Sequence, residues 1–100
     1  SIDAQEALRV GLVQKVVPHE ALLDKAKRVA ATINERSSSA VRLAKASINQ
    51  GLDVDIRTGN EIEAHTFAHS FATEDLREGV RAFMEKRTPQ FSGRYTKPVR

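Results

Sequence analysis

The sequence contains no cysteine and no tryptophan, and only five of its 100 residues are aromatic. Without cysteine, neither a disulfide framework nor a thiolate metal site can form. The few aromatic residues leave a core to be built from aliphatic side chains and alanine, as in closely packed helices. No apolar run approaches the roughly 20 residues that cross a bilayer, and no signal-peptide pattern is present. We therefore expect no membrane-spanning segment. Because the chain starts at Ser1 without methionine, we also expect a processed or truncated chain.

No large excess of one charge is present either. Sixteen basic residues stand against 13 acidic ones, which gives a net charge of +3 and a pI of about 9.6. The two signs are interleaved, and the clearest local excess lies in the tail at Arg94, Lys97 and Arg100. Proteins that bind nucleic acid usually gather their basic residues on one face. A solvated surface without a nucleic-acid partner is therefore the prediction, and a basic helical nucleic-acid binder is kept as an alternative.

The first 18 residues predict a short helix followed by a short strand. Asp3 is placed to cap the helix, with Glu6 in the reciprocal position of a capping box, and Gly11 suits the left-handed position that ends it. Residues 12–17 are rich in β-branched side chains and are bounded by Gly11 and Pro18, which is typical of a strand. No second strand is evident for it to pair with. Either the segment is an extended linker, or its partner lies outside these 100 residues; we favour the second interpretation.

Three amphipathic helices are predicted next. The first covers about residues 19–35, and the second follows the serine run at residues 37–39 and ends at Gly51. The third begins near Asp55 or Thr58, where Thr58 and a glutamate three residues later can form a capping box. Small residues along the second helix permit a close approach between helices.

The last helix has the clearest start and stop signals. Thr73 is a favourable N-cap, two acidic residues follow it, Lys86 and Arg87 fall in the last turn, and Pro89 prevents continuation. Gly79 interrupts the helix at a cost of roughly 1 kcal/mol relative to alanine. We expect another backbone to pack closely there, although a neutral surface glycine is the alternative.

No catalytic or metal site is predicted from the residues themselves. His65 and His69 are four positions apart, as in zinc-binding helices, but no third ligand is evident. No Gly-x-Ser-x-Gly motif and no glycine-rich phosphate loop occur. The acidic cluster of Glu74, Asp75 and Glu78 is explained by the helix dipole and by pairing at i, i+4.

Several stretches carry a family resemblance when they are taken in order. Residues 67–91 read FAHSFATEDLREGVRAFMEKRTPQF. They are preceded by IDAQEA at residues 2–7, by GLV and VVP at residues 11–18, and by SSSAV with AK at residues 37–45. Over residues 1 to 93 this ordered set resembles the C-terminal end of the enoyl-CoA hydratase/isomerase family, also called the crotonase family. Ser39 departs from the family pattern, which often has proline there.

The resemblance implies a fold with two parts. In this family an N-terminal spiral of β-β-α turns carries the oxyanion hole and the catalytic glutamates, and C-terminal helices drive the formation of trimers, often paired into hexamers. The chain is accordingly expected to be mostly α, as the C-terminal helical (trimerisation) region of a crotonase-like α/β fold with one short strand near residues 12–17. Residues 1–18 would end the spiral core, residues 19–88 would form the helical assembly region, and residues 89–100 an extended tail.

The resemblance also implies a function, namely part of an enoyl-CoA hydratase that adds water to the 2,3-double bond of enoyl-CoA thioesters. No position matches the catalytic glutamates, so the chain alone is expected to be inactive. The positions that resemble CoA contacts, in the same or a neighbouring subunit, are Phe67, Phe83 and Lys86. The aromatic rings would wall the pantetheine or adenine region, and Lys86 would meet a phosphate. Acyl-CoA would be the substrate, with no cofactor and no metal, in the cytoplasm or the mitochondrial matrix.

Alternatives remain at this point. The protein could belong to the isomerase or another branch of the family, or its helices could serve only as a non-enzymatic assembly module. For the individual residues, Phe83 could be plain core, and Lys86 could simply complement the negative end of the helix dipole.

Overall fold

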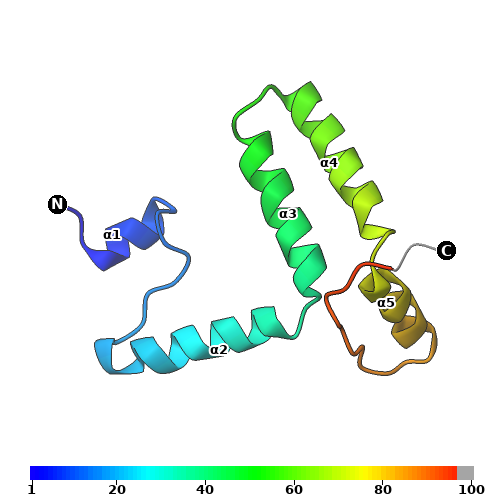
Figure 1. Ribbon diagram of the computed structural model, residues 1–100. Coiled ribbons are helices and arrows are strands. Elements are labelled where there is room, and N and C mark those ends of the chain that lie inside the picture. The colour runs from blue at the N-terminus through cyan, green and yellow to red at the C-terminus, as the bar shows by residue number, and fades with distance from the viewer. Residues whose placement is uncertain (97–100) are drawn as a thin grey trace. The chain divides into compact units, whose positions relative to one another are not determined.

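The computed structural model describes residues 1–96 and is mainly helical (Figure 1). It divides into two compact units, Ser1–Ile33 and Asn34–Arg100, which are described separately below. Within the described residues, no helix is both long and apolar enough to cross a membrane. The predicted mostly-α fold is confirmed. The elements are α1 (Ala4–Arg9), a 3₁₀ turn η1 (His19–Ala21), α2 (Leu22–Asn34), α3 (Ser38–Gly51), α4 (Ile56–Ser70) and α5 (Glu74–Met84).

Helix α1 begins and ends largely as its sequence predicts. The Asp3 carboxylate accepts from the Glu6 backbone N–H at 2.8 Å. The Glu6 side chain pairs with Arg9, at 2.7 Å from its Nε, instead of occupying the reciprocal position of a capping box. Gly11 has a φ of +78°, and the amides of Gly11 and Leu12 bind carbonyls of the last turn at 3.1 and 2.9 Å. This pair of bonds is a Schellman motif, which requires the left-handed residue that glycine supplies.

The strand expected near residues 12–17 is absent, and this prediction was wrong for the described part of the chain. A strand needs a neighbour to receive its backbone N–H and C=O groups. The described residues contain one isolated β-bridge, between Thr73 and Tyr95, and no ladder that the segment could join. Its β-branched composition is therefore not sufficient to make it a strand here.

The helix predicted over residues 19–35 is confirmed as the η1 turn and α2, with Pro18 at the position that precedes the turn. Its apolar stripe is exposed: Leu22, Leu23, Val29 and Ile33 each keep half or more of their surface in contact with solvent.

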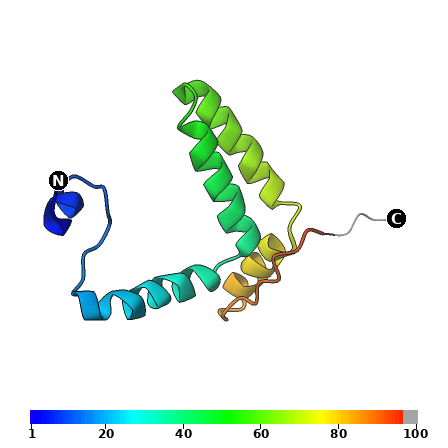
Figure 2. The same ribbon diagram turned by 60° about the vertical axis from the view of Figure 1, so that its left-hand side comes forward.

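In the second unit, α3 and α4 form a helical hairpin whose two helices lie side by side (Figures 1 and 2). Ser37 caps α3 by accepting from the backbone N–H of Ala40 at 3.1 Å, as the serine run predicts. Helix α4 starts at Asp55 and not at Thr58, because the Asp55 carboxylate accepts from the backbone N–H and also from the hydroxyl of Thr58, at 3.1 and 2.7 Å. Gly51 ends α3, and a Cβ at Gly59 would lie only 3.7 Å from its backbone.

Helix α5 starts at the predicted N-cap, where the Thr73 hydroxyl accepts from a backbone N–H at 3.2 Å. Its end differs from the prediction. The C-cap is Glu85, so Lys86 and Arg87 lie beyond the last turn instead of within it. Lys86 has a φ of +53°, and the amides of Lys86 and Arg87 bind the carbonyls of Phe83 and Ala82 at 3.2 and 3.0 Å. The helix thus ends in the same motif as α1, with lysine in place of glycine.

The reason expected for Gly79 is not found. No backbone atom outside its own helix lies within 4 Å of a Cβ built on Gly79, and the nearest atom is Cε1 of the Phe91 ring at 3.7 Å. That distance is an ordinary van der Waals contact. Gly79 therefore makes the helix less stable than alanine would, and no close backbone approach requires it.

We expect Gly79→Ala to raise the free energy of unfolding by up to about 1 kcal/mol, because alanine is the better helix former and its methyl fits against Phe91. Urea titrations of the wild type and the variant, followed by circular dichroism, measure the difference. A loss of stability would show that the ring cannot accept the methyl group.

Candidate functional site: an apolar groove and a C-terminal strap

A groove of about 720 Å³ lies between α3, α4 and α5. Its walls are mainly apolar. Leu43 and Ile48 come from α3, Phe67 from α4 and Phe83 from α5, and Phe91 adds a ring from the segment after α5. A concave, largely apolar surface with a few polar groups is the usual form of a small-molecule site.

Two of the three predicted contact residues meet in this groove. Phe67 and Phe83 both line it and are 65% and 85% exposed, so neither belongs to a core within the described residues. Phe67 is braced by Phe71 in an edge-to-face pair whose ring centroids are 5.4 Å apart. Lys86 does not line the groove and lies three residues beyond Phe83 at the end of α5. Their role as ligand contacts stays a prediction.

The segment after α5 runs back along the start of that helix, and we call residues 87–96 the strap (Figures 1 and 2). The Glu74 amide donates to the Arg94 carbonyl at 2.9 Å, and the Thr96 amide donates to the Ala72 carbonyl at 2.8 Å. Residues 89–96 of the strap are the described part of the tail predicted over residues 89–100. Lys97 and Arg100, named above for their charge, lie outside the described residues.

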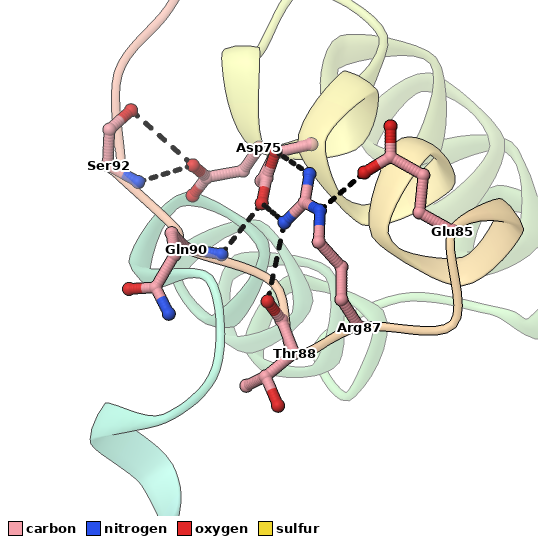
Figure 3. A network of polar contacts seen from close by, with 7 residues as sticks. Asp75, Glu85, Arg87, Thr88, Gln90 and Ser92 are labelled. Atoms are coloured by element: carbon pink, nitrogen blue, oxygen red, sulfur yellow. Dashed lines mark hydrogen bonds and ion pairs between the residues drawn. The ribbon is translucent and has the colours of Figure 1, made fainter.

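A buried carboxylate fastens the strap. Asp75 is 3% exposed and accepts from the hydroxyls of Ser37 and Ser39 at 2.6 and 3.3 Å. From the strap, the Ser92 amide donates to it at 2.7 Å (Figure 3). The Gly93 amide also donates to it, at 3.0 Å. Burial by itself raises the pKa of Asp75, but the hydrogen bonds led by Ser37 and Gly93 outweigh it and hold the pKa below its usual value. One carboxylate therefore joins α3, α5 and the strap.

A second group, which we call the clamp, consists of Glu78, Glu85 and Arg87. Arg87 donates to Glu85 at 2.6 Å (Figure 3). It also donates to both carboxylate oxygens of Glu78, at 2.6 and 3.1 Å. The Gln90 amide also donates to Glu78, at 2.8 Å. Arg87 and then Gln90 lower the pKa of Glu78 to about 2, and the two carboxylates, Glu78 first, raise the pKa of Arg87. The clamp fixes the turn between α5 and the strap.

These pKa shifts predict acid sensitivity of the strap. A carboxylate whose pKa is lower in the folded chain stabilises the fold above its unfolded pKa, and this contribution is lost as the pH falls through the folded pKa. For Glu78 the loss is expected between about pH 4.5 and about pH 2. Urea titrations over this range measure it, and Glu78→Gln should flatten the dependence more than Glu61→Gln, which removes an exposed carboxylate from α4. Equal curves for the two variants would contradict the prediction.

Three residues of this region were missed from the sequence. The sequence pattern explains Asp75 and Glu78 by helix electrostatics alone and gives Phe91 no role. The partners of Asp75 are up to 38 residues away in the sequence, so no local spacing could have revealed them. Pro89, which follows the end of α5 and forbids its continuation, was the available signal that the chain turns back near this point.

The two histidines of α4 do not gather further ligands. Among the described residues, no three histidine, aspartate or glutamate side chains lie close enough together to hold a metal ion.

Comparisons with known proteins agree on one family. The family model described as Enoyl-CoA hydratase/isomerase matches residues 1–94. The chain is 48% identical over 90 residues to the crotonyl-CoA hydratase of Syntrophomonas wolfei, covering 90% of this chain and 35% of that protein. It is 44% identical over 87 residues to the short-chain-enoyl-CoA hydratase of Clostridium acetobutylicum, covering 87% and 33%.

A solved structure gives the same result. The crystal structure of the enoyl-CoA hydratase from Bacillus anthracis matches with a TM-score of 0.89 at 44% identity, over 93% of this chain and 36% of that one. The chain spans about a third of the length of the curated relatives it matches.

Proposed function

Because the chain belongs to the enoyl-CoA hydratase/isomerase family, we propose that it is the C-terminal part of an enoyl-CoA hydratase. That enzyme adds water across the 2,3-double bond of an enoyl-CoA thioester. The thioester is the substrate, and the reaction needs no cofactor. The observation that carries the proposal is the apolar groove lined by Phe67 of α4 and Phe83 of α5, the two aromatic rings expected at a CoA site.

In this proposal these 100 residues contribute to binding the acyl-CoA, and the catalytic groups come from the rest of the enzyme. The groove takes an apolar or aromatic part of the acyl-CoA against the exposed faces of Phe67 and Phe83, which removes their surface from water. Lys86 supplies a compact positive charge for a phosphate group of CoA. The glutamates that act on the water and on the α-carbon would come from outside these residues.

The exposed apolar surface supports a second part of the proposal, which is assembly into a trimer or a dimer of trimers. Leu22 on α2, Phe71 after α4 and Met84 on α5 are each more than half exposed. Apolar surface of this extent usually marks a contact with another protein surface.

Two matched relatives, from Dictyostelium discoideum and Mus musculus, are named as mitochondrial. We accordingly place the protein in the cytoplasm or, in a eukaryote, in the mitochondrial matrix.

Two alternatives differ in their outcome. An isomerase would move the double bond of a 3-enoyl-CoA without adding water, and a pure assembly module would not bind the thioester at all. Assays of the complete gene product with 2-enoyl-CoA and with 3-enoyl-CoA separate hydration from isomerisation.

We expect Lys86→Ala in the complete gene product to raise the KM for enoyl-CoA about tenfold and to leave kcat nearly unchanged. A charge-assisted contact to a phosphate acts equally on the bound substrate and on the transition state, so its loss appears in KM. Lys86→Arg, which keeps the charge, is the control. A KM unchanged by Lys86→Ala would remove the pocket role and favour the assembly module.

A further inference from the structure

Lys86 occupies a backbone conformation that other residues rarely adopt. It is the only residue other than glycine with a positive φ within the described range 1–96. The left-handed region is open to glycine, whereas a Cβ makes it unfavourable. The comparison with α1 makes this plain, because both helices end with the same two hydrogen bonds and α1 has Gly11 at the equivalent position. The chain thus retains lysine at a position where glycine would be less strained.

The clamp is what holds this conformation. The residues on either side of Lys86 are tied together, since Arg87 donates to Glu85 at 2.6 Å and to both oxygens of Glu78, which lies about two turns earlier in α5. The Gln90 amide donates to the same Glu78 carboxylate at 2.8 Å. The turn from residue 85 to residue 90 is therefore fixed to the side of α5 at several points (Figure 3).

The charged side chains at this turn fall into two groups, those that pair with one another in the clamp and Lys86. Arg87 is occupied by two carboxylates, and Glu78 has both oxygens engaged by Arg87. The one guanidinium of the clamp is already paired with two carboxylates, which leave the three groups with a net charge of −1, so the clamp itself does not attract an incoming anion. None of the ion pairs among the described residues includes Lys86, which is exposed. The charge available for an anion at this turn is therefore that of Lys86.

We propose that Glu78 and Arg87 are positioning residues for the binding of the CoA phosphates: they hold the turn in the conformation from which the Lys86 side chain leaves the end of α5. Lysine has a flexible stem, and a fixed starting point reduces the freedom that it loses when it binds a phosphate. This inference rests on the proposed function, because it assumes that Lys86 contacts the ligand.

The test is a double-mutant cycle in the complete gene product, with CoA itself as the titrant in isothermal titration calorimetry. We expect Lys86→Ala to raise the Kd for CoA about tenfold, and Glu78→Gln to raise it about three- to fivefold. In the Lys86→Ala background, Glu78→Gln should have almost no further effect, because it acts through Lys86. Glu61→Gln, which removes an exposed carboxylate elsewhere in the second unit, should leave the Kd unchanged.

The outcomes separate the role of Lys86 in binding CoA from the positioning role of Glu78 and Arg87. If the wild type does not bind CoA, or if Lys86→Ala leaves the Kd unchanged, the pocket role and this inference are both overturned. If Lys86→Ala weakens binding but Glu78→Gln does not, or if the two effects simply add, only the positioning role is overturned. If Glu78→Gln unfolds at the assay temperature, Arg87→Lys takes its place in the cycle, since it keeps the charge but loses the two-point contact.

Discussion

Asp75→Ala should lower the free energy of unfolding of the second unit by about 3 kcal/mol. The carboxylate is 3% exposed and accepts from two serine hydroxyls and from the strap amides of Ser92 and Gly93. Its removal leaves buried donors without an acceptor, and each such group costs about 1–3 kcal/mol unless the structure opens to water. Urea titration measures the total loss, and amide hydrogen exchange at Ser92 and Gly93 reports release of the strap.

Glu74→Ala is the matched control. Glu74 precedes Asp75 in the first turn of α5, and its loss removes the same favourable charge from the helix N-terminus. However, Glu74 is exposed, and among the residues that the structure describes its side chain accepts only from the Ser92 hydroxyl, at 3.1 Å. We expect its replacement to cost well under half as much. Similar losses for the two variants would mean that the helix dipole, and not the buried network, explains the acidic pair.

Gly93→Ala should lower the free energy of unfolding by about 2 kcal/mol, which is the second-largest effect that we expect. Gly93 has a φ of +71°, where a Cβ adds about 1 kcal/mol or more of strain. The new Cβ would also collide with the Ser38 Oγ, and the amide that donates to Asp75 would be displaced. Urea titration gives the loss, and Ser92 amide exchange shows whether the strap has detached.

A variant background that lacks the Ser38 hydroxyl separates the backbone strain at residue 93 from the collision with Ser38. Ser38→Ala removes the Oγ, so Gly93→Ala should cost less in that background than in the wild type. Gly11→Ala is a further control, because Gly11 has a φ of +78° but nothing within 4 Å of a built Cβ. If Gly93→Ala costs no more than Gly11→Ala, contact with Ser38 adds nothing.

The helix starts could be predicted from sequence wherever one N-cap candidate stands within one turn of the backbone N–H that it binds. Asp3, Ser37 and Thr73 each accept from a backbone N–H three residues later, so the signal is local. The start of α4 was placed less well because two candidate caps, Asp55 and Thr58, stand three residues apart. Asp55 takes the position, and Thr58 becomes its hydrogen-bond donor.

Features that depend on distant partners could not be predicted in the same way. The β-branched residues at positions 12–17 have a strand composition, but a strand also needs a paired neighbour, which the described residues lack. The network around Asp75 joins residues 37 to 93, and no spacing rule connects them. The left-handed Lys86 was missed because a charged residue near a helix C-terminus is already explained by the helix dipole.

The residues of the candidate site were predicted from the family resemblance more than from the residue pattern. Periodicity alone makes Phe67 and Phe83 parts of two separate apolar stripes. Only the packing of α3, α4 and α5 places them in one groove, together with Phe91, which the pattern left without a role.

The bridge between Tyr95 and Thr73 also gives the chain an optical reporter of its own. Tyr95 is the single tyrosine of a sequence without tryptophan, and it lies in the strap, where 54% of its surface meets solvent. With no indole to absorb its excitation energy, the emission of these 100 residues comes from this one ring. The docking and release of the strap can therefore be followed by fluorescence, in real time and without changing a residue.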